Sequence, residues 1–165
     1  MSWVIQPRPD PGFEIVHFVL GYYDGILDGI ADYQGSPHHF ALEERGPPAE
    51  SWDLFRLTPL TPDAFRAAEE GWDIWCRWER AHRGELGSHV GSNPALPEDE
   101  DRQRKAAQVV AAWLASASGN AFVAEAEFKP LLSDAWCGTV RGALQVRWKN
   151  AVKAGDAHRD RPGSR

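Results

Sequence analysis

The 165-residue sequence lacks the features that mark several broad classes of protein. Its two cysteines, Cys76 and Cys137, are far apart and fit no metal or redox spacing, which excludes a disulfide framework and predicts a reducing compartment. The N-terminus does not join a basic stretch to an apolar run, as a signal peptide does. No stretch reaches the roughly 20 apolar residues of a membrane span. We therefore expect a cytoplasmic protein with no membrane partner.

Basic residues are scarce in the first part of the chain. Residues 1–60 contain nine acidic and three basic residues, whereas residues 101–165 contain six acidic and eleven basic ones. Lys and Arg that neutralise phosphates drive the binding of nucleic acid, so the acidic part argues against a phosphate-binding surface. We expect no nucleic-acid partner, and we expect the basic residues near the C-terminus to be solvated.

The sequence also lacks short motifs that carry a known chemistry. It contains no Gly-x-x-x-x-Gly-Lys, Gly-x-Gly-x-x-Gly, His-Glu-x-x-His, Gly-x-Ser-x-Gly or Cys-x-x-Cys. No cofactor and no metal site is therefore indicated, and a small-molecule ligand stays unassigned. The absence of motifs does not by itself exclude an enzyme; we favour a protein without enzymatic activity and leave the alternative open.

The residues that are present predict a single α+β domain over residues 1–150 and a polar, flexible tail over residues 151–165. The first third predicts an antiparallel meander of three to four strands, because runs of β-branched and aromatic residues alternate with tight turns. The expected strands are residues 13–23, 30–33, 38–44 and 52–58. Asp24-Gly25 and Asp28-Gly29 are strong turn signals, and we place them at the two ends of the first connection.

Two amphipathic helices are predicted in the middle of the chain. Thr61, Pro62 and Asp63 provide a hydroxyl N-cap, a proline at the first helical position and an acid in the first turn. This helix extends to about His82, and its apolar arc is wider than a one-sided surface helix needs. The second helix covers residues 97–118. Its predicted one-sided apolar face consists of Ala106, Val109, Val110, Trp113, Leu114 and Ala117. Apolar alternation over residues 122–129 and 144–148 predicts a C-terminal strand pair.

Candidate binding residues gather in the meander, where no Lys or Arg occurs between Pro9 and Glu44. One interpretation is a cleft for a cation, a basic peptide or a metal; the other is that Asp24 and Asp28 only form their turns. We favour the turns for the individual aspartates. Their spacing fits no calcium loop, so a positively charged protein partner is favoured over a metal. The candidate residues are Tyr22, Tyr23, Asp24, Asp28, Asp32, His38 and His39.

His38 and His39 are the candidate catalytic residues of the alternative function. Adjacent residues in a strand point to opposite faces, so both cannot bind one metal without distortion. One of them, with a neighbouring aspartate, would form the base of a small hydrolase-type enzyme, with or without a metal. A histidine that packs or bonds locally is the simpler interpretation.

Trp72, Trp75 and Trp78 recur every three residues along the first predicted helix. Such a run either belongs to the core or anchors a partner, since tryptophan is enriched in the centres of protein interfaces. The wide apolar arc of the helix is compatible with both. We keep the three residues as candidates for binding.

One stretch also carries a resemblance to known proteins. Tyr22-Tyr23-Asp24-Gly25 and Gly29-Ile30-Ala31-Asp32-Tyr33-Gln34-Gly35-Ser36-Pro37-His38-His39-Phe40, with Trp72, Trp75 and Trp78-Glu79, resemble a family of small bacterial proteins of unassigned function. The resemblance covers roughly residues 13–82 and implies a bacterial, free-standing small protein. It transfers no catalytic residue. Two functions therefore stay open: a non-enzymatic protein that binds another protein through the acidic meander and the Trp-rich helix, and the small hydrolase.

Overall fold

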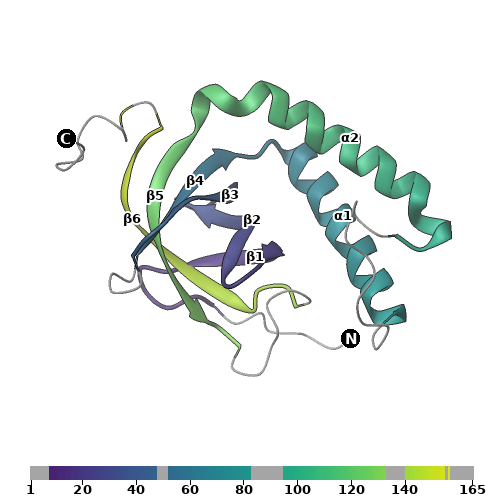
Figure 1. The fold of residues 1–165 in the computed structure, drawn as a ribbon, viewed down its shortest axis with the longest axis horizontal. Helices are drawn as coiled ribbons and strands as arrows, with labels where there is room; N and C mark the ends of the chain where they lie inside the picture. The colour runs from purple at the N-terminus through teal and green to yellow at the C-terminus, as the bar shows by residue number, and fades with distance from the viewer. Residues whose placement is uncertain (1–7, 48–51, 83–94, 133–139, 155, 157–165) are drawn as a thin grey trace. The chain divides into compact units, whose positions relative to one another are not determined.

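The computed structural model describes residues 8–47, 52–82, 95–132, 140–154 and 156 (Figure 1). The chain divides into two compact units. One comprises Met1–Pro59 and Ser118–Arg165 and holds the six strands found among the described residues, and the other, Leu60–Ala117, contains the two α-helices. The strand unit is discontinuous in sequence because the helical unit is inserted between its fourth and fifth strands.

The six strands form a closed antiparallel barrel in which each strand pairs with its neighbours in chain order and the last pairs with the first. The strands are β1 (Glu14–Tyr22), β2 (Ile26–Tyr33), β3 (Ser36–Arg45), β4 (Asp53–Pro59), β5 (Phe122–Pro130) and β6 (Leu144–Lys153). The α+β prediction of an antiparallel sheet with an N-terminal meander and a separate C-terminal strand pair was therefore wrong. Closure removes the sheet edges, and it depends on the pairing of β4 with β5 and of β1 with β6, which are remote in sequence.

The two Asp-Gly pairs of the first hairpin have different structural roles. Asp24 and Gly25 form the turn, with φ angles of 54° and 128°. Asp28 and Gly29 do not bracket the connection as predicted, because β2 already begins at Ile26 and contains both residues. The prediction treated every Asp-Gly pair as a turn, whereas glycine also occurs inside strands where another group approaches closely.

Gly29 shows such a close approach. A Cβ atom at this position would lie 2.5 Å from the carbonyl oxygen of Phe18 on β1 and 2.7 Å from Cζ of Phe40 on β3. The Phe40 ring packs directly against the backbone of this residue, so only glycine fits here without a shift of its neighbours.

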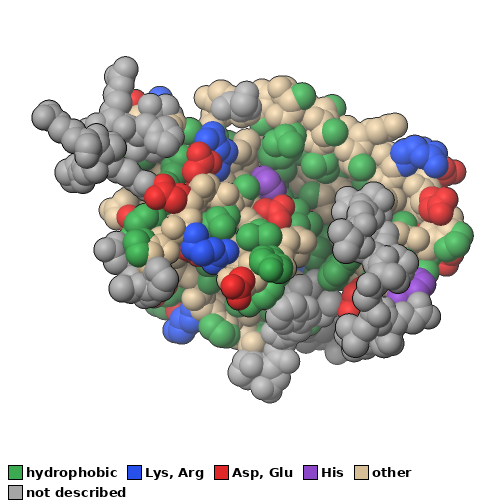
Figure 2. Space-filling model, viewed as in Figure 1, with side chains coloured by type: hydrophobic (Ala, Val, Ile, Leu, Met, Phe, Trp, Pro, Cys, Tyr) green, Lys and Arg blue, Asp and Glu red, His purple; other side chains and the backbone are tan. Residues whose placement is uncertain are grey.

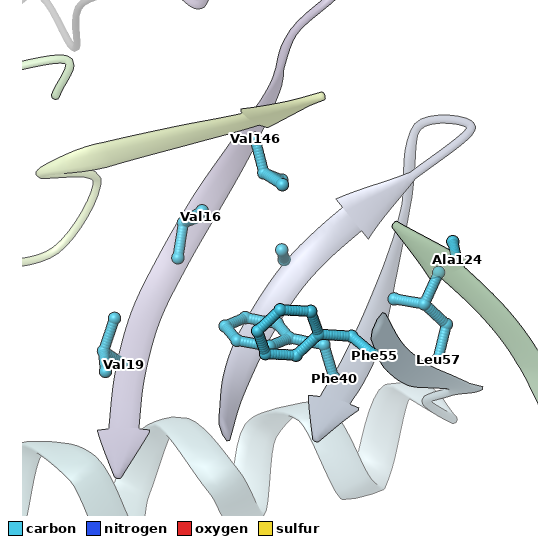
Figure 3. Packing of buried hydrophobic residues seen from close by; sticks show 8 residues of the cluster. Val16, Val19, Phe40, Phe55, Leu57, Ala124 and Val146 are labelled. Atoms are coloured by element: carbon cyan, nitrogen blue, oxygen red, sulfur yellow. The ribbon is translucent and has the colours of Figure 1, made fainter. Parts of the chain in front are cut away.

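The barrel interior is filled by side chains contributed by all six strands (Figure 3). The cluster consists of Val16, Val19, Ala31, Phe40, Phe55, Leu57, Ala124 and Val146. The rings of Phe40, Phe55, Phe128 and Trp148 contact one another in edge-to-face or tilted arrangements, with centroid distances from 5.5 to 6.4 Å. Small barrels are filled in this way, and aromatic pairs in these geometries are favourable.

The helical unit contains α1 (Pro62–Ala81), the short 3₁₀ helix η1 (Pro97–Asp99) and α2 (Glu100–Ala117), and another 3₁₀ turn, η2 (Ser118–Asn120), leads into β5. The predicted start of α1 is confirmed, since the side chain of Thr61 accepts a hydrogen bond from the backbone N–H of Ala64 at 3.2 Å. In the part of the chain that the structure describes, neither helix is long and apolar enough to cross a lipid bilayer.

The prediction of a one-sided apolar face on α2 was wrong about how much of that face is buried. Ala106 and Trp113 are buried, but Val109 and Leu114 are 41% and 55% exposed. Ala106 and Trp113 are seven residues apart and lie on one line along the helix. The helix therefore buries a narrower stripe than its sequence pattern suggests.

Candidate functional site

The first predicted group of site residues lies at the turn between β1 and β2. Tyr22 and Tyr23 are 50% and 79% exposed, and Leu20 two residues earlier is 47% exposed. We call Leu20, Tyr22, Tyr23 and Asp24 the tip surface. The register of β1 against β2 shifts on either side of Gly21, which interrupts the regular pairing at this end of the hairpin.

Arg45, from the end of β3, holds the turn in place. Its Nη1 donates to the carbonyl oxygen of Asp24 at 3.2 Å and to Oδ2 of Asp53 at 3.4 Å. Gly25 permits this contact, because a Cβ atom there would lie 2.8 Å from the same Nη1. The backbone N–H of Tyr23 also donates to the carbonyl oxygen of Gly25 at 2.9 Å. The turn that carries the tip surface is therefore held by a hydrogen bond within the turn and by the contacts of Arg45 from β3.

The acidic residues next to the tip surface are partly neutralised. Arg56 on β4 donates two hydrogen bonds of 2.8 Å to the carboxylate of Glu43 on β3, and these bonds raise the pKa of Arg56 above its ordinary value. Asp53 is similarly paired with Arg45. The carboxylate of Asp24 forms no ion pair within the residues that the structure describes, although its backbone oxygen is held by Arg45.

The predicted residues Asp28, Asp32 and His39 lie in two His–Asp pairs on β1, β2 and β3, and the fourth member of these pairs, His17, was not predicted. Nε2 of His17 lies 2.7 Å from Oδ1 of Asp32, and Nε2 of His39 lies 3.4 Å from Oδ2 of Asp28. Asp28 and Asp32 are four residues apart on one strand, so the pairs are separated by about 13 Å. They form two sites rather than one. Among the described residues, no group of three or more His, Cys, Asp or Glu side chains is placed to hold a metal ion.

Sequence reasoning missed His17, which makes the shorter of the two contacts. The register of β1 against β2 shifts between Val16 and Phe18, and His17 lies at this irregularity. Such bulges redirect a side chain. The sequence signals a histidine in a strand, but the strand register that brings it to Asp32 is not readable from local patterns.

His38 is separated from these pairs. Its side chain is 6% exposed, its Nδ1 lies 2.8 Å from the carbonyl oxygen of Ser36, and its ring packs edge-on against Tyr33 at 5.4 Å. His39 instead approaches Asp28. The two adjacent histidines therefore have different surroundings and do not act at one point.

The three tryptophans of α1 do not share one environment. Trp72 is buried at 6% exposure, whereas Trp75 and Trp78 are half-buried. Trp78 stacks on the ring of His82, with a centroid distance of 4.6 Å. Their role in binding stays a prediction, with Trp72 the member that is least accessible to a partner.

A groove of about 480 Å³ lies on the barrel wall and is lined by Trp52, Glu125, Ala126, Glu127, Arg147 and Lys149. Its charges are balanced internally, since Oε2 of Glu127 accepts hydrogen bonds of 2.7 Å from both Lys149 and Arg147. The bond from Lys149, and then those from Arg147, lower the pKa of Glu127. Figure 2 likewise shows Lys and Arg side chains next to Asp and Glu side chains over the barrel.

Comparisons of this chain with protein-family models, with curated proteins and with solved structures found no match. The resemblance to small bacterial proteins stays a prediction.

Proposed function

We propose that this chain is a non-enzymatic binding protein that recognises another protein through the tip surface of its β1–β2 hairpin. The observation that carries the proposal is the exposure of Leu20, Tyr22 and Tyr23, three large apolar side chains within four residues. Single exposed apolar residues are ordinary, but several in one short segment favour an interaction site. Tyrosine is frequent in such sites because it offers a large contact area and loses little conformational entropy.

The filled barrel interior supports recognition at the surface. Phe40, Phe55, Phe128 and Trp148 occupy the space in which larger barrels hold a ligand. A ligand therefore has to bind outside the barrel, where the tip surface offers exposed apolar area on a fixed turn.

The Trp-rich helix contributes less to this proposal than the sequence suggested. Burial removes Trp72 from direct contact with a partner, and Trp78 already stacks on His82. We therefore assign the proposed function to the acidic meander. Within the meander we assign it to the hairpin tip and not to Asp28, Asp32 or the histidines.

The alternative is a small hydrolase that uses His39 with Asp28 as the orienting carboxylate. The contact of 3.4 Å supports it, because a base held by a carboxylate is the arrangement that activates a nucleophile. His38 gives no such support, as it lies against Tyr33 and Ser36. If the alternative holds, purified protein cleaves members of an ester and phosphoester panel, and the His39→Ala variant loses at least about 100-fold of that rate.

The binding proposal is tested by capture of partners from a lysate of the native host. The unmodified chain is compared with the Tyr22→Ala/Tyr23→Ala variant and with a Val109→Ala/Leu114→Ala control, which removes exposed apolar groups from α2. We expect a defined protein to be retained by the unmodified chain and the control, and about tenfold less by the tip variant. Equal retention by all three proteins would contradict the proposal. Thermal unfolding of each variant verifies that it is folded, since exposed substitutions usually change stability by less than about 0.5 kcal/mol.

A further inference from the structure

We infer that the tip surface takes a basic segment of its partner, and that Arg45 positions the surface for it; this inference rests on the proposed function. Tyr22 and Tyr23 directly precede Asp24 in the chain, and both tyrosine side chains are at least half exposed. Lys and Arg side chains bind such a combination in two ways, through the faces of the rings and through a charge-assisted hydrogen bond to the carboxylate.

The charges around the tip favour the same ligand. Asp24, Glu43, Glu44 and Asp53 supply four carboxylates at this end of the barrel, against the guanidinium groups of Arg45 and Arg56. No Lys or Arg occurs between Pro9 and Glu44. An approaching basic segment therefore meets an excess of negative charge, whereas an acidic segment is repelled.

Arg45 does not offer its charge to the partner in this arrangement. Its guanidinium group pairs with Asp53, and it donates to the carbonyl oxygen of Asp24, at the point where the chain takes a positive φ of 54°. A turn held in this conformation loses less entropy on binding than a mobile one. Arg45 is therefore a positioning residue, and its loss affects binding through the orientation of Tyr23 and Asp24.

Two effects of removing Arg45 have opposite signs, which makes the inference testable. Loss of a positive charge strengthens the attraction of a basic ligand, whereas loss of the positioning contact weakens binding. We therefore expect Arg45→Ala to bind a basic peptide about fivefold more weakly than the unmodified chain, with partial recovery in Arg45→Lys, because an ammonium group also reaches a carbonyl oxygen. Tighter binding by Arg45→Ala would overturn the positioning role.

The experiment uses the full chain and three fluorescein-labelled nonapeptides in which glycine alternates with Lys, with Gln or with Glu. Fluorescence anisotropy at low salt is expected to give at least about tenfold tighter binding of the Lys peptide than of the other two, weakened by Asp24→Asn, by Tyr23→Ala and by added salt. Equal binding of the three peptides, or binding unaffected by Asp24→Asn and Tyr23→Ala, would overturn the inference. The two proposals fail in different ways. If a protein partner is captured through the tyrosines but the Lys peptide is not preferred, only this inference is refuted. If capture does not depend on the tyrosines, the proposed function itself is refuted.

Discussion

Arg77 on α1 donates two hydrogen bonds to Asp99 at the end of η1, from Nε to Oδ2 at 3.1 Å and from Nη2 to Oδ1 at 2.7 Å. The side chain of Asp99 is only 5% exposed, and Arg102 on α2 donates to it as well, at 3.1 Å. Arg102 in turn pairs with Glu70 on α1. One buried carboxylate thus joins both helices of the helical unit.

Asp99→Ala is expected to destabilise the helical unit by about 2 kcal/mol, because it removes the charge-assisted hydrogen bonds from Arg77 and Arg102 that join the two helices, while both arginines remain partly exposed to solvent. Circular dichroism during urea unfolding measures the change. Asp101→Ala is the matched control, since Asp101 pairs with Arg104 on the exposed surface. Its removal is expected to lower the free energy of unfolding by less than about 0.5 kcal/mol. Similar losses in both variants would show that Asp99 has no special role.

Gly29→Ala is expected to destabilise the barrel by about 2 kcal/mol or more, because the new methyl group would collide with the backbone of Phe18 and the ring of Phe40. Gly119→Ala serves as its control, since a Cβ atom there has no neighbour within 4 Å. Denaturant unfolding followed by tryptophan fluorescence compares the two. A stable Gly29→Ala protein would show that the packing between β2 and β3 adjusts easily.

The contact between Asp10 and Lys129 gives a pH dependence of known sign. The hydrogen bond from Lys129, which outweighs the effect of desolvation, lowers the pKa of Asp10, and Gln145 lowers it further. This contact stabilises the folded chain above the ordinary aspartate pKa of about 3.9, and the stabilisation is lost as the pH falls through the lowered value. An NMR titration of Asp10 is expected to show a higher pKa in Lys129→Met and no change in Lys153→Met. An unchanged pKa in Lys129→Met would mean that the contact is absent in solution.

The two His–Asp pairs are expected to differ in strength. A double-mutant cycle with His17→Gln and Asp32→Asn should give a coupling energy of about 1 kcal/mol, the usual value for a partly buried hydrogen bond. The same cycle for His39 and Asp28, which are 3.4 Å apart, should give less than about 0.5 kcal/mol. The reverse order would indicate that the His39 pair shortens in solution and would strengthen the hydrolase alternative.

Local signals in the sequence predicted the elements of this fold better than their assembly. The N-cap at Thr61 and the turn at Asp24-Gly25 are encoded by residues next to each other, and both occur as expected. The closure of the barrel depends on pairs such as Val16 with Leu144, which no periodicity signals. An open sheet was therefore the natural but wrong prediction.

In the candidate site too, local features were predicted and contacts between remote residues were not. Tyr22, Tyr23 and Asp24 stood out as residues of a tight turn, and the structure shows both tyrosines at least half exposed. The role of Arg45 was not predicted, because the contact between β3 and the turn follows from the pairing of three strands. Side-chain contacts between strands can be predicted only when the pairing register is known, and the register depends on the complete barrel.

The insertion of the helical unit has a consequence for how this protein can vary. Leu57 of β4 pairs with Phe122 of β5, so the chain leaves the barrel and returns to it on adjacent strands. A segment attached at two neighbouring strands can change in length without changing the order of the strands. The connection between β4 and β5 is therefore a position at which a chain of this topology can gain or lose helices while the strand order stays the same.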